Sequence, residues 1–163
     1  MAASADACTY VTIIECGERS TISSSAFNTA LYKIELQKIE EGLFPITLGG
    51  DHSIAISSAL ADAKKNDGHI GMIWIDAHTD YNTFESTITG NIHGLPLAAI
   101  DGYEKRFLTE FHDGNYFKPE NTVIVGGRDI DPLEVENLKD AGVKVFTTEE
   151  IHEVKYNNLK FTK

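Results

Sequence analysis

The sequence predicts an α/β fold, a three-layer αβα sandwich around a mostly parallel sheet, and three observations support it. Short apolar runs recur along the chain as FPITLGG, IGMIWID, TVIVGG and VKVFTT, with YVTIIE as a candidate first run. These runs are continuous rather than alternating, which is typical of strands covered on both faces in a parallel sheet. Segments with helical periodicity lie between them, and strands that alternate with helices indicate βαβ units.

The first two helices are predicted from apolar spacing and from their end signals. Residues 25–42 place Phe27, Leu31 and Ile34 along one face and end in a glycine, a typical C-cap. Residues 53–68 are rich in alanine and end in two lysines followed by Asn-Asp-Gly, which is a stop signal. We therefore expect a helix before the FPITLGG strand and another after it.

A third helix is expected over residues 131–142, where the sequence begins with a capping signature. Asp131 is placed as the N-cap, a proline takes the first helical position, and Glu134 stands where a capping box needs an acid. Residues 81–118 interrupt the alternation, because they are rich in Thr, Gly, Asn and single charges and include Pro96 inside a candidate helix. A long insertion after the carboxyl end of a strand is where open α/β sheets place ligand sites.

Composition predicts one compact domain over residues 1–163, because the chain is long enough to bury a core. It carries 14 basic and 25 acidic residues, and the net charge of −11 argues against nucleic acid or an anionic membrane as a partner. Cys8 and Cys16 form no CxxC pair, so we expect reduced thiols and a cytoplasmic location. No apolar stretch reaches the roughly 20 residues of a membrane helix.

The motif DAHTD follows a buried apolar run and contains three metal-ligand residues in alternation. On a strand, side chains at every second position share one face, so Asp76, His78 and Asp80 would point the same way. Two carboxylates and an imidazole suit Mn²⁺, and less certainly Zn²⁺, Fe or Co²⁺. The alternative is a polar strand end that caps helices or pairs with lysine. Because unpaired polar groups on a buried strand are costly, the pattern favours a metal site.

Two further motifs place histidines where they could reach the same region. In ITLGGDHS an apolar strand runs into two glycines, and His52 would project from the carboxyl edge of the sheet toward DAHTD. Helix capping by Asp51 or Ser53 is the alternative for this motif taken alone. In TGNIHG two glycines bracket Asn91 and His93, and that histidine could be a ligand or a proton donor and acceptor near neutral pH.

The motifs GGDHS, DAHTD and GNIHG, in this order, resemble the arginase/agmatinase (ureohydrolase) family, and VGGRDIDPLE resembles its arginase branch. The resemblance covers most of the chain and implies an arginase-like fold. It implies a hydrolase in which two Mn²⁺ ions activate a water that attacks a guanidinium carbon, so that L-arginine and water yield L-ornithine and urea. The implied metal ligands are His52, Asp76, His78 and Asp80, and the implied catalytic residues are Asp80 and the proton shuttle His93.

The resemblance also implies how these residues divide their roles. Asp76 would bridge both ions, with His52 and Asp80 on one ion and His78 on the other. The implied substrate-binding residues are Asn82 and Thr89 for the α-carboxylate, Asp131 and Glu134 for the α-amino group, and Asn91 beside them. For the Asp131 and Glu134 pair, helix capping remains an alternative, and both roles are compatible.

The chain departs from the family in its extent. Family members continue with an Asp-x-Asp pair that completes both metal sites and a glutamate that pairs with the guanidinium group, and they begin with an earlier strand. We therefore expect a single incomplete ureohydrolase-like domain that binds Mn²⁺ weakly and turns over little arginine. The alternatives are agmatinase or another guanidino hydrolase, and a non-catalytic truncated paralogue that acts as a binding or regulatory module. An exposed sheet edge and the resemblance predict a homo-oligomer, a trimer or hexamer.

Overall fold

The computed structural model describes residues 9–13 and 21–158, with side chains described from residue 26 to residue 153. The strands are β1 (Thr9–Ile13), β2 (Phe44–Leu48), β3 (Met72–Ile75), β4 (Thr122–Gly127) and β5 (Lys144–Thr147). The α-helices are α1 (Thr21–Glu40), α2 (Ile54–Lys65), α3 (Pro96–Ile100), α4 (Pro132–Ala141) and α5 (Thr148–Asn158). No described helix is long and apolar enough to cross a membrane. Cys8 and Cys16 lie outside the described residues, so their redox state stays a prediction.

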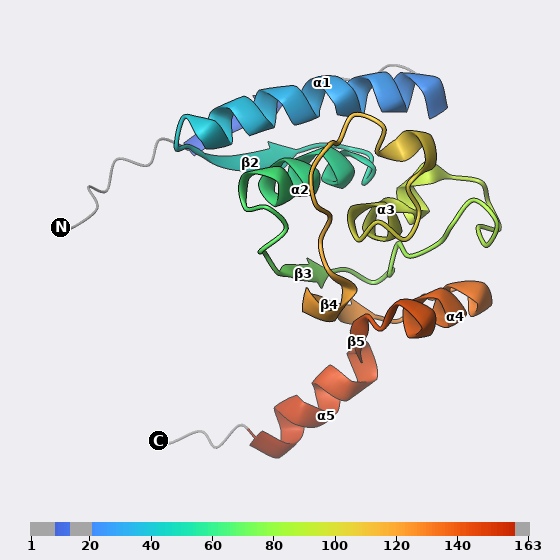
Figure 1. The fold of residues 1–163 in the computed structure, drawn as a ribbon. Helices are drawn as coiled ribbons and strands as arrows, with labels where there is room; N and C mark the ends of the chain where they lie inside the picture. The colour runs from blue at the N-terminus through green and yellow to red at the C-terminus, as the bar shows by residue number, and fades with distance from the viewer. Residues whose placement is uncertain (1–8, 14–20, 159–163) are drawn as a thin grey trace, which may run out of the picture.

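Every strand pair in the described ranges is parallel, which confirms the α/β class. β1 pairs with β2, where Val11 lies opposite Ile46. β4 lies between β3 and β5, where Ile124 lies opposite Trp74 and Val145. The described strands form two sheets where the sequence predicted one, because β2 and β3 are not paired with each other. The chain crosses from β2 to β3 through α2 (Figure 1).

The predicted helices are present, with shifts at their ends. α1 begins at Thr21, earlier than predicted, and α5 is an additional helix after the last strand. α4 has the predicted capping box, in which the Glu134 carboxylate accepts the Asp131 N–H at 3.2 Å, and it ends at Gly142 with φ 80°. Pro96 begins α3 rather than lying inside a helix, because its missing N–H is harmless in the first turn.

α2 joins the two sheets through a shared core. Ile56 and Leu60 are fully buried and pack with Tyr32 of α1. The opposite part of α2 packs with Trp74 of β3 and Ile124 of β4. Burial of apolar surface is the main favourable contribution to folding, so α2 holds the carboxyl ends of β2 and β3 in a fixed relation.

The buried face of α1 differs from the predicted one. Leu31 is buried as predicted, but Phe27 and Ile34 are only partly buried. Asn28 and Glu35 take part in the buried face instead. One hydroxyl of α2, from Ser57, donates to Asn28, and one hydroxyl each from β2 and α2 donates to Glu35. These hydrogen bonds offset the cost of burying polar side chains, which a search for apolar spacing does not detect.

One face of β2 and β3 is uncovered in the described ranges. Phe44, Ile46 and Leu48 of β2 point away from the helices and are 68%, 43% and 57% exposed. Ile73 and Ile75 of β3 are 68% and 80% exposed. The opposite face packs against helices, so the described part of the fold has a continuous helical layer on one side of these strands. The bare side is a row of exposed apolar side chains.

Candidate metal centre

His52 is positioned by a tight turn between β2 and α2. Gly49 lies so close to Ile54 that a Cβ atom at this glycine would be 2.2 Å from the Ile54 Cδ1 atom. The Asp51 carboxylate accepts the Ser53 N–H at 3.0 Å, which forms a local turn before α2, whose N-cap Ser53 makes no side-chain capping hydrogen bond. The turn leaves His52 at the carboxyl end of β2, as the sequence predicted for this residue.

The metal-ligand residues of DAHTD do not lie on one strand face, so the predicted geometry is wrong. β3 ends at Ile75, so Asp76, His78 and Asp80 lie in the loop that follows the strand and not on one strand face. The Asp76 carboxylate accepts the backbone N–H of His78 at 3.0 Å, which stabilises a bend that strand geometry would not allow. The three residues still gather near the carboxyl end of β3, but the loop rather than the pleat places them.

Asp80 has a left-handed backbone conformation, with φ 49°. Its carbonyl oxygen accepts the N–H groups of Leu97 at 3.0 Å and Ala98 at 3.3 Å, at the start of α3. These two hydrogen bonds satisfy donors that a helix start leaves free, and they hold a conformation that is costly for a non-glycine residue. The conformation turns the Asp80 side chain toward the end of β2.

Three side chains from the segments that follow β2 and β3 converge into one cluster. Ligand atoms of His52, Asp76 and Asp80 all lie within 4.8 Å of one another. His52 Nδ1 lies 2.8 Å from Asp80 Oδ2 and 3.5 Å from Asp76 Oδ2. The second carboxylate oxygen of Asp76, Oδ1, lies 3.4 Å from His78 Nδ1, and His78 Nε2 lies 3.6 Å from Asp129. Asp76 therefore stands between two imidazoles, one on each oxygen.

The electrostatics of the cluster suit a cation. Asp80 Oδ2 is buried and receives no well-aligned hydrogen bond from the described residues, although His52 Nδ1 is close. A buried carboxylate oxygen without a donor is costly, and a positive ion would compensate it. Interaction with Asp80 raises the pKa of His52 above its usual value, against the effect of burial and with help from Asp76. Because metal ligation needs the neutral imidazole, protons and a cation would compete for this site.

The ring of Trp74 packs against the ring of His52, a contact that was not predicted from the sequence. The two rings are stacked, with centroids 4.5 Å apart and planes 24° from parallel. Trp74 is 6% exposed and is the single tryptophan of the chain. Its position on the covered face of β3 could have been found from the strand pattern, but its contact with His52 depends on tertiary packing. The stack restricts the His52 ring, which remains 40% exposed.

Two of the predicted substrate residues meet beside the cluster. Asn82 Nδ2 donates to Asp131 Oδ2 at 3.0 Å, and Asn82 is buried. Glu134 is also buried, and its Oε1 atom accepts the Tyr81 N–H at 2.7 Å. Burial raises the pKa of Glu134, although hydrogen bonds from the backbone oppose the shift. Both Glu134 oxygens accept backbone N–H groups, so its structural role is present in the fold while its substrate role stays a prediction.

The remaining predicted residues lie on the exposed loop that follows. Thr89 and Asn91 are exposed, and the Thr89 hydroxyl accepts the Asn91 N–H at 3.2 Å. His93 Nδ1 lies 3.5 Å from Asp51 Oδ2, which brings the GNIHG motif to the GGDHS turn. Burial alone would raise the pKa of Asp51, but hydrogen bonds from Ser53 and the interaction with His93 lower it overall. The Asp51–His93 contact was not anticipated from sequence spacing.

An open cleft of about 610 Å³ leads to the cluster from the β2 side. Thr47 and the two glycines after β2 line one wall, and Ser58 and Asp62 of α2 line another. His52 and Asp76 also line the cleft. The cleft gives solvent and small ligands access to these two side chains.

Two parallel sheets joined through α2, with a His–Asp cluster at the carboxyl ends of their strands, define an α/β protein with a candidate divalent-cation centre. Comparison with known proteins gives the family within this class. The model described as Arginase family matches residues 3–160. The chain is 47% identical over 114 residues to the arginase of Bacillus subtilis (strain 168), and 41% identical over 141 residues to that of Staphylococcus aureus (strain COL). The chain belongs to the arginase family, as its motifs predicted.

The matches cover 69% and 83% of this chain but only 38% and 46% of these two relatives. The chain thus spans less than half the length of the curated relatives it matches. The solved arginase from Bacillus caldovelox has a TM-score of 0.79 at 37% identity, covering 88% of this chain and 49% of that one. A formimidoylglutamase from Bacillus subtilis, 20% identical with a TM-score of 0.63, covers 88% of this chain and 40% of that one and shares the fold.

Proposed function

We propose that this chain contributes to the active centre of a ureohydrolase that converts L-arginine and water to L-ornithine and urea. The observation that carries the proposal is the convergence of His52, Asp76 and Asp80 from the ends of two separate strands. Similarity to the arginases of two bacteria supports the choice of reaction. Because the chain spans less than half of these relatives, the activity is proposed for the centre that these residues help to form.

The residues present fit a divalent cation, since the cluster combines carboxylate and imidazole ligand atoms around a buried Asp80 oxygen that receives no well-aligned hydrogen bond. Oxygen donors with one imidazole suit Mn²⁺. His52 and Asp80 would hold one ion, His78 the other, and Asp76 both. When bound, two Mn²⁺ ions would supply Lewis acidity and lower the pKa of a water at the guanidinium carbon. Asp80 would act in catalysis by holding this arrangement in place.

His93 is proposed to move the proton of the reaction. Breaking the guanidino C–N bond leaves an amine, which departs with a proton delivered to its nitrogen. A histidine titrates near neutral pH and can take a proton from water and pass it on. The Asp51 carboxylate lies 3.5 Å from His93 Nδ1, where it would orient the ring. His93 is about half exposed, which allows exchange with solvent.

The amino-acid end of the substrate is proposed to bind at the Asn82–Asp131 pair. The Asn82 amide would donate to the α-carboxylate, and the Asp131 carboxylate would accept from the α-ammonium group. Thr89, Asn91 and Glu134 complete the proposed set, with Glu134 acting in addition to its capping role. Agmatine lacks the α-carboxylate, so a buried asparagine next to an acid favours arginine over agmatine. Agmatine keeps the amine that Asp131 would contact, so Asn82→Ala should weaken activity toward arginine more than toward agmatine, and equal losses would favour another guanidino hydrolase.

A binding or regulatory module is the second candidate, and the ligand count favours it. Within the described ranges, three residues gather their ligand atoms within 4.8 Å, which is fewer than an ion needs to replace its water shell. A homo-oligomer, a trimer or hexamer, and a cytoplasmic location are part of this proposal. Association is supported by the bare row of Phe44, Ile46, Leu48, Ile73 and Ile75. Further donors could then come from a neighbouring subunit.

Trp74 provides a direct test of metal binding at the proposed centre. Because its ring stacks on His52, Mn²⁺ binding should quench the fluorescence of this single tryptophan with saturation. His52→Ala should abolish the saturable quenching. The exposed His69→Ala variant is the matched control and should titrate as the wild type does. Equal titrations for all three proteins would show that His52 is not a metal ligand.

Urea release and metal content, measured on one sample, decide between the two functions. Urea formation with two Mn²⁺ ions per chain, lost in His78→Ala, would support the hydrolase. Saturable Mn²⁺ binding without urea release from L-arginine would support the binding module. Sedimentation of the same sample would show whether activity belongs to an oligomer.

A further inference from the structure

The residue that binds the proposed α-carboxylate is held by a short turn. Asn82 is followed by residues 83–86, in which Ser86 Oγ accepts the Thr83 N–H at 2.8 Å. The same hydroxyl donates to Asn82 Oδ1 at 2.8 Å. With its oxygen engaged in this way, the Asn82 amide directs its NH₂ group toward Asp131, 3.0 Å away. The orientation of Asn82 therefore depends on where the turn lies.

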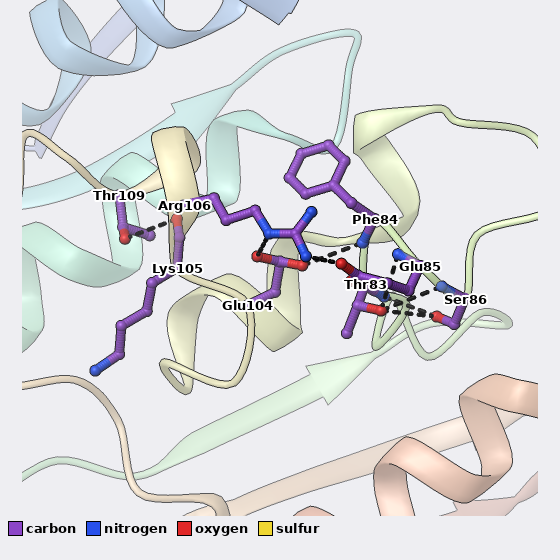
Figure 2. A network of polar contacts seen from close by, with 8 residues as sticks. All are labelled: Thr83, Phe84, Glu85, Ser86, Glu104, Lys105, Arg106 and Thr109. Atoms are coloured by element: carbon purple, nitrogen blue, oxygen red, sulfur yellow. Dashed lines mark hydrogen bonds and ion pairs between the residues drawn. The ribbon is translucent and has the colours of Figure 1, made fainter.

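A second segment, residues 104–106, holds this turn from the other side (Figure 2). Glu104 is buried, and its Oε2 atom accepts the Phe84 N–H at 3.1 Å. Arg106 Nε lies 3.4 Å from Glu104 Oε1, and the same guanidinium group pairs with Glu85 through Nη2. The guanidinium carbon also lies 5.3 Å from the centre of the Phe84 ring. Arg106 thus contacts the turn at Phe84 and Glu85. It also contacts Glu104, the acid that accepts the Phe84 N–H.

The proposed function does not account for these contacts, because Arg106 touches neither the metal cluster nor the Asn82–Asp131 pair. Its role follows from charge. Glu104 and Glu85 are both acids, and Glu104 is 4% exposed, so its ionised form needs a cation nearby. A guanidinium group offers several donors in one plane and serves two acids at once, which a lysine ammonium does less well. Without Arg106, the two acids would repel each other and loosen the turn.

We propose that Arg106 is a positioning residue that, through Glu104 and Glu85, fixes the turn at residues 83–86 and so orients Asn82 for an α-carboxylate. The part that concerns the α-carboxylate rests on the proposed function, whereas the part that concerns the orientation of Asn82 does not. Arg106 acts through the turn and contributes to selectivity without contacting the ligand.

Amide hydrogen exchange on the full chain tests the orientation directly. In Arg106→Gln, exchange at the Phe84 and Ser86 amides should accelerate roughly tenfold, the scale of one lost charge-assisted hydrogen bond. The Asn82 side-chain amide signal should shift toward that of a free amide, which a distant structural change would not produce. Arg106→Lys should restore part of the protection. Lys105→Gln is the matched control, because Lys105 lies over the Tyr116 ring and points away from the turn (Figure 2).

Ligand binding separates the proposal from the proposed function. With Mn²⁺ present, Arg106→Gln should weaken the binding of L-ornithine roughly tenfold. The binding of putrescine, which lacks the carboxylate, should not change. Absence of ornithine binding in the wild type would count against the proposed function, while the exchange result would still decide the role of Arg106. If Arg106→Gln also loosens the α2 amides, Glu85→Gln replaces it, since Glu85 is exposed. The proposal would be overturned if Arg106→Gln exchanged at Phe84, Ser86 and Asn82 at the wild-type rate. It would also be overturned if Glu85→Gln accelerated amide exchange equally throughout the chain.

Discussion

Asp101 is expected to make the stability of the fold depend on pH. This residue follows α3 and is 7% exposed. Its carboxyl group accepts hydrogen bonds from the Thr122 hydroxyl at 3.0 Å and from the Tyr81 hydroxyl at 3.3 Å. Burial raises its pKa from 3.8 to about 7, although both hydrogen bonds act in the opposite direction. The perturbation is Asp101→Asn, which keeps the shape and an acceptor oxygen but removes the ionisation.

The sign and size follow from the two pKa values. The unfolded chain loses the Asp101 proton near pH 3.8 and the folded chain near pH 7. The stabilisation from keeping the proton is therefore fully present below the lower pKa and is lost as pH rises through the folded value. Between about pH 5.5 and about pH 8 this group should lower the free energy of unfolding by about 2 kcal/mol, at 1.36 kcal/mol per unit. Asp101→Asn should lack this component.

Urea denaturation of the wild type and Asp101→Asn at about pH 5.5 and about pH 8 measures the effect. Both pH values lie above the sequence pI of about 4.9, which favours solubility. The expected result is that the difference in unfolding free energy between Asp101→Asn and the wild type grows by about 2 kcal/mol from the lower pH to the higher. The exposed acid Glu110 supplies the control, because Glu110→Gln should follow the wild type at both pH values. A constant difference for Asp101→Asn would refute the reasoning.

Two further predictions concern packing and backbone conformation. Ile124 is fully buried in the middle of β4, so Ile124→Ala should lower the free energy of unfolding by about 2–5 kcal/mol. Val123 is only partly buried, so Val123→Ala should cost less. Equal losses would contradict the core assignment. Gly142 ends α4 with φ 80°, so Gly142→Ala should cost about 1 kcal/mol in the same assay. Gly94 has open space around its Cα and an ordinary φ, and a loss in Gly94→Ala as large as in Gly142→Ala would argue against backbone strain.

The strands and long helices could be predicted because their signals are local. Continuous apolar runs located all five strands, and the Asp-Pro-x-Glu signature located the start of α4 together with its capping box. The face of α1 could not be predicted, because Asn28 and Glu35 become buried only when α2 and β2 supply hydroxyl partners. The pairing of strands was equally hidden, since parallel strands adjacent in sequence need not be neighbours in a sheet.

The candidate centre shows the same division between local and tertiary signals. The residue types in GGDHS and DAHTD indicated that His52, Asp76 and Asp80 approach each other, whereas His78 lies outside this three-residue cluster. The predicted reason, strand alternation, was wrong. Asp80 approaches His52 because its own backbone is left-handed, a conformation held by hydrogen bonds from the start of α3. Spacing carries no information on such a conformation. The contacts of Trp74 with His52 and of Asp51 with His93 likewise join residues that only the folded chain brings together.

The position of Asp76 explains why the proposed centre should behave as one unit. Its two oxygens face different imidazoles, His52 on one side and His78 on the other. A charge bound on either side would pull on the same carboxylate, so occupancy of one side alters the donor available to the other. His52 adds to this coupling, because the acids around it raise its pKa and a bound cation would have to displace that proton. A chain with few additional donors would then fill neither side tightly, and donors supplied to one side would strengthen both.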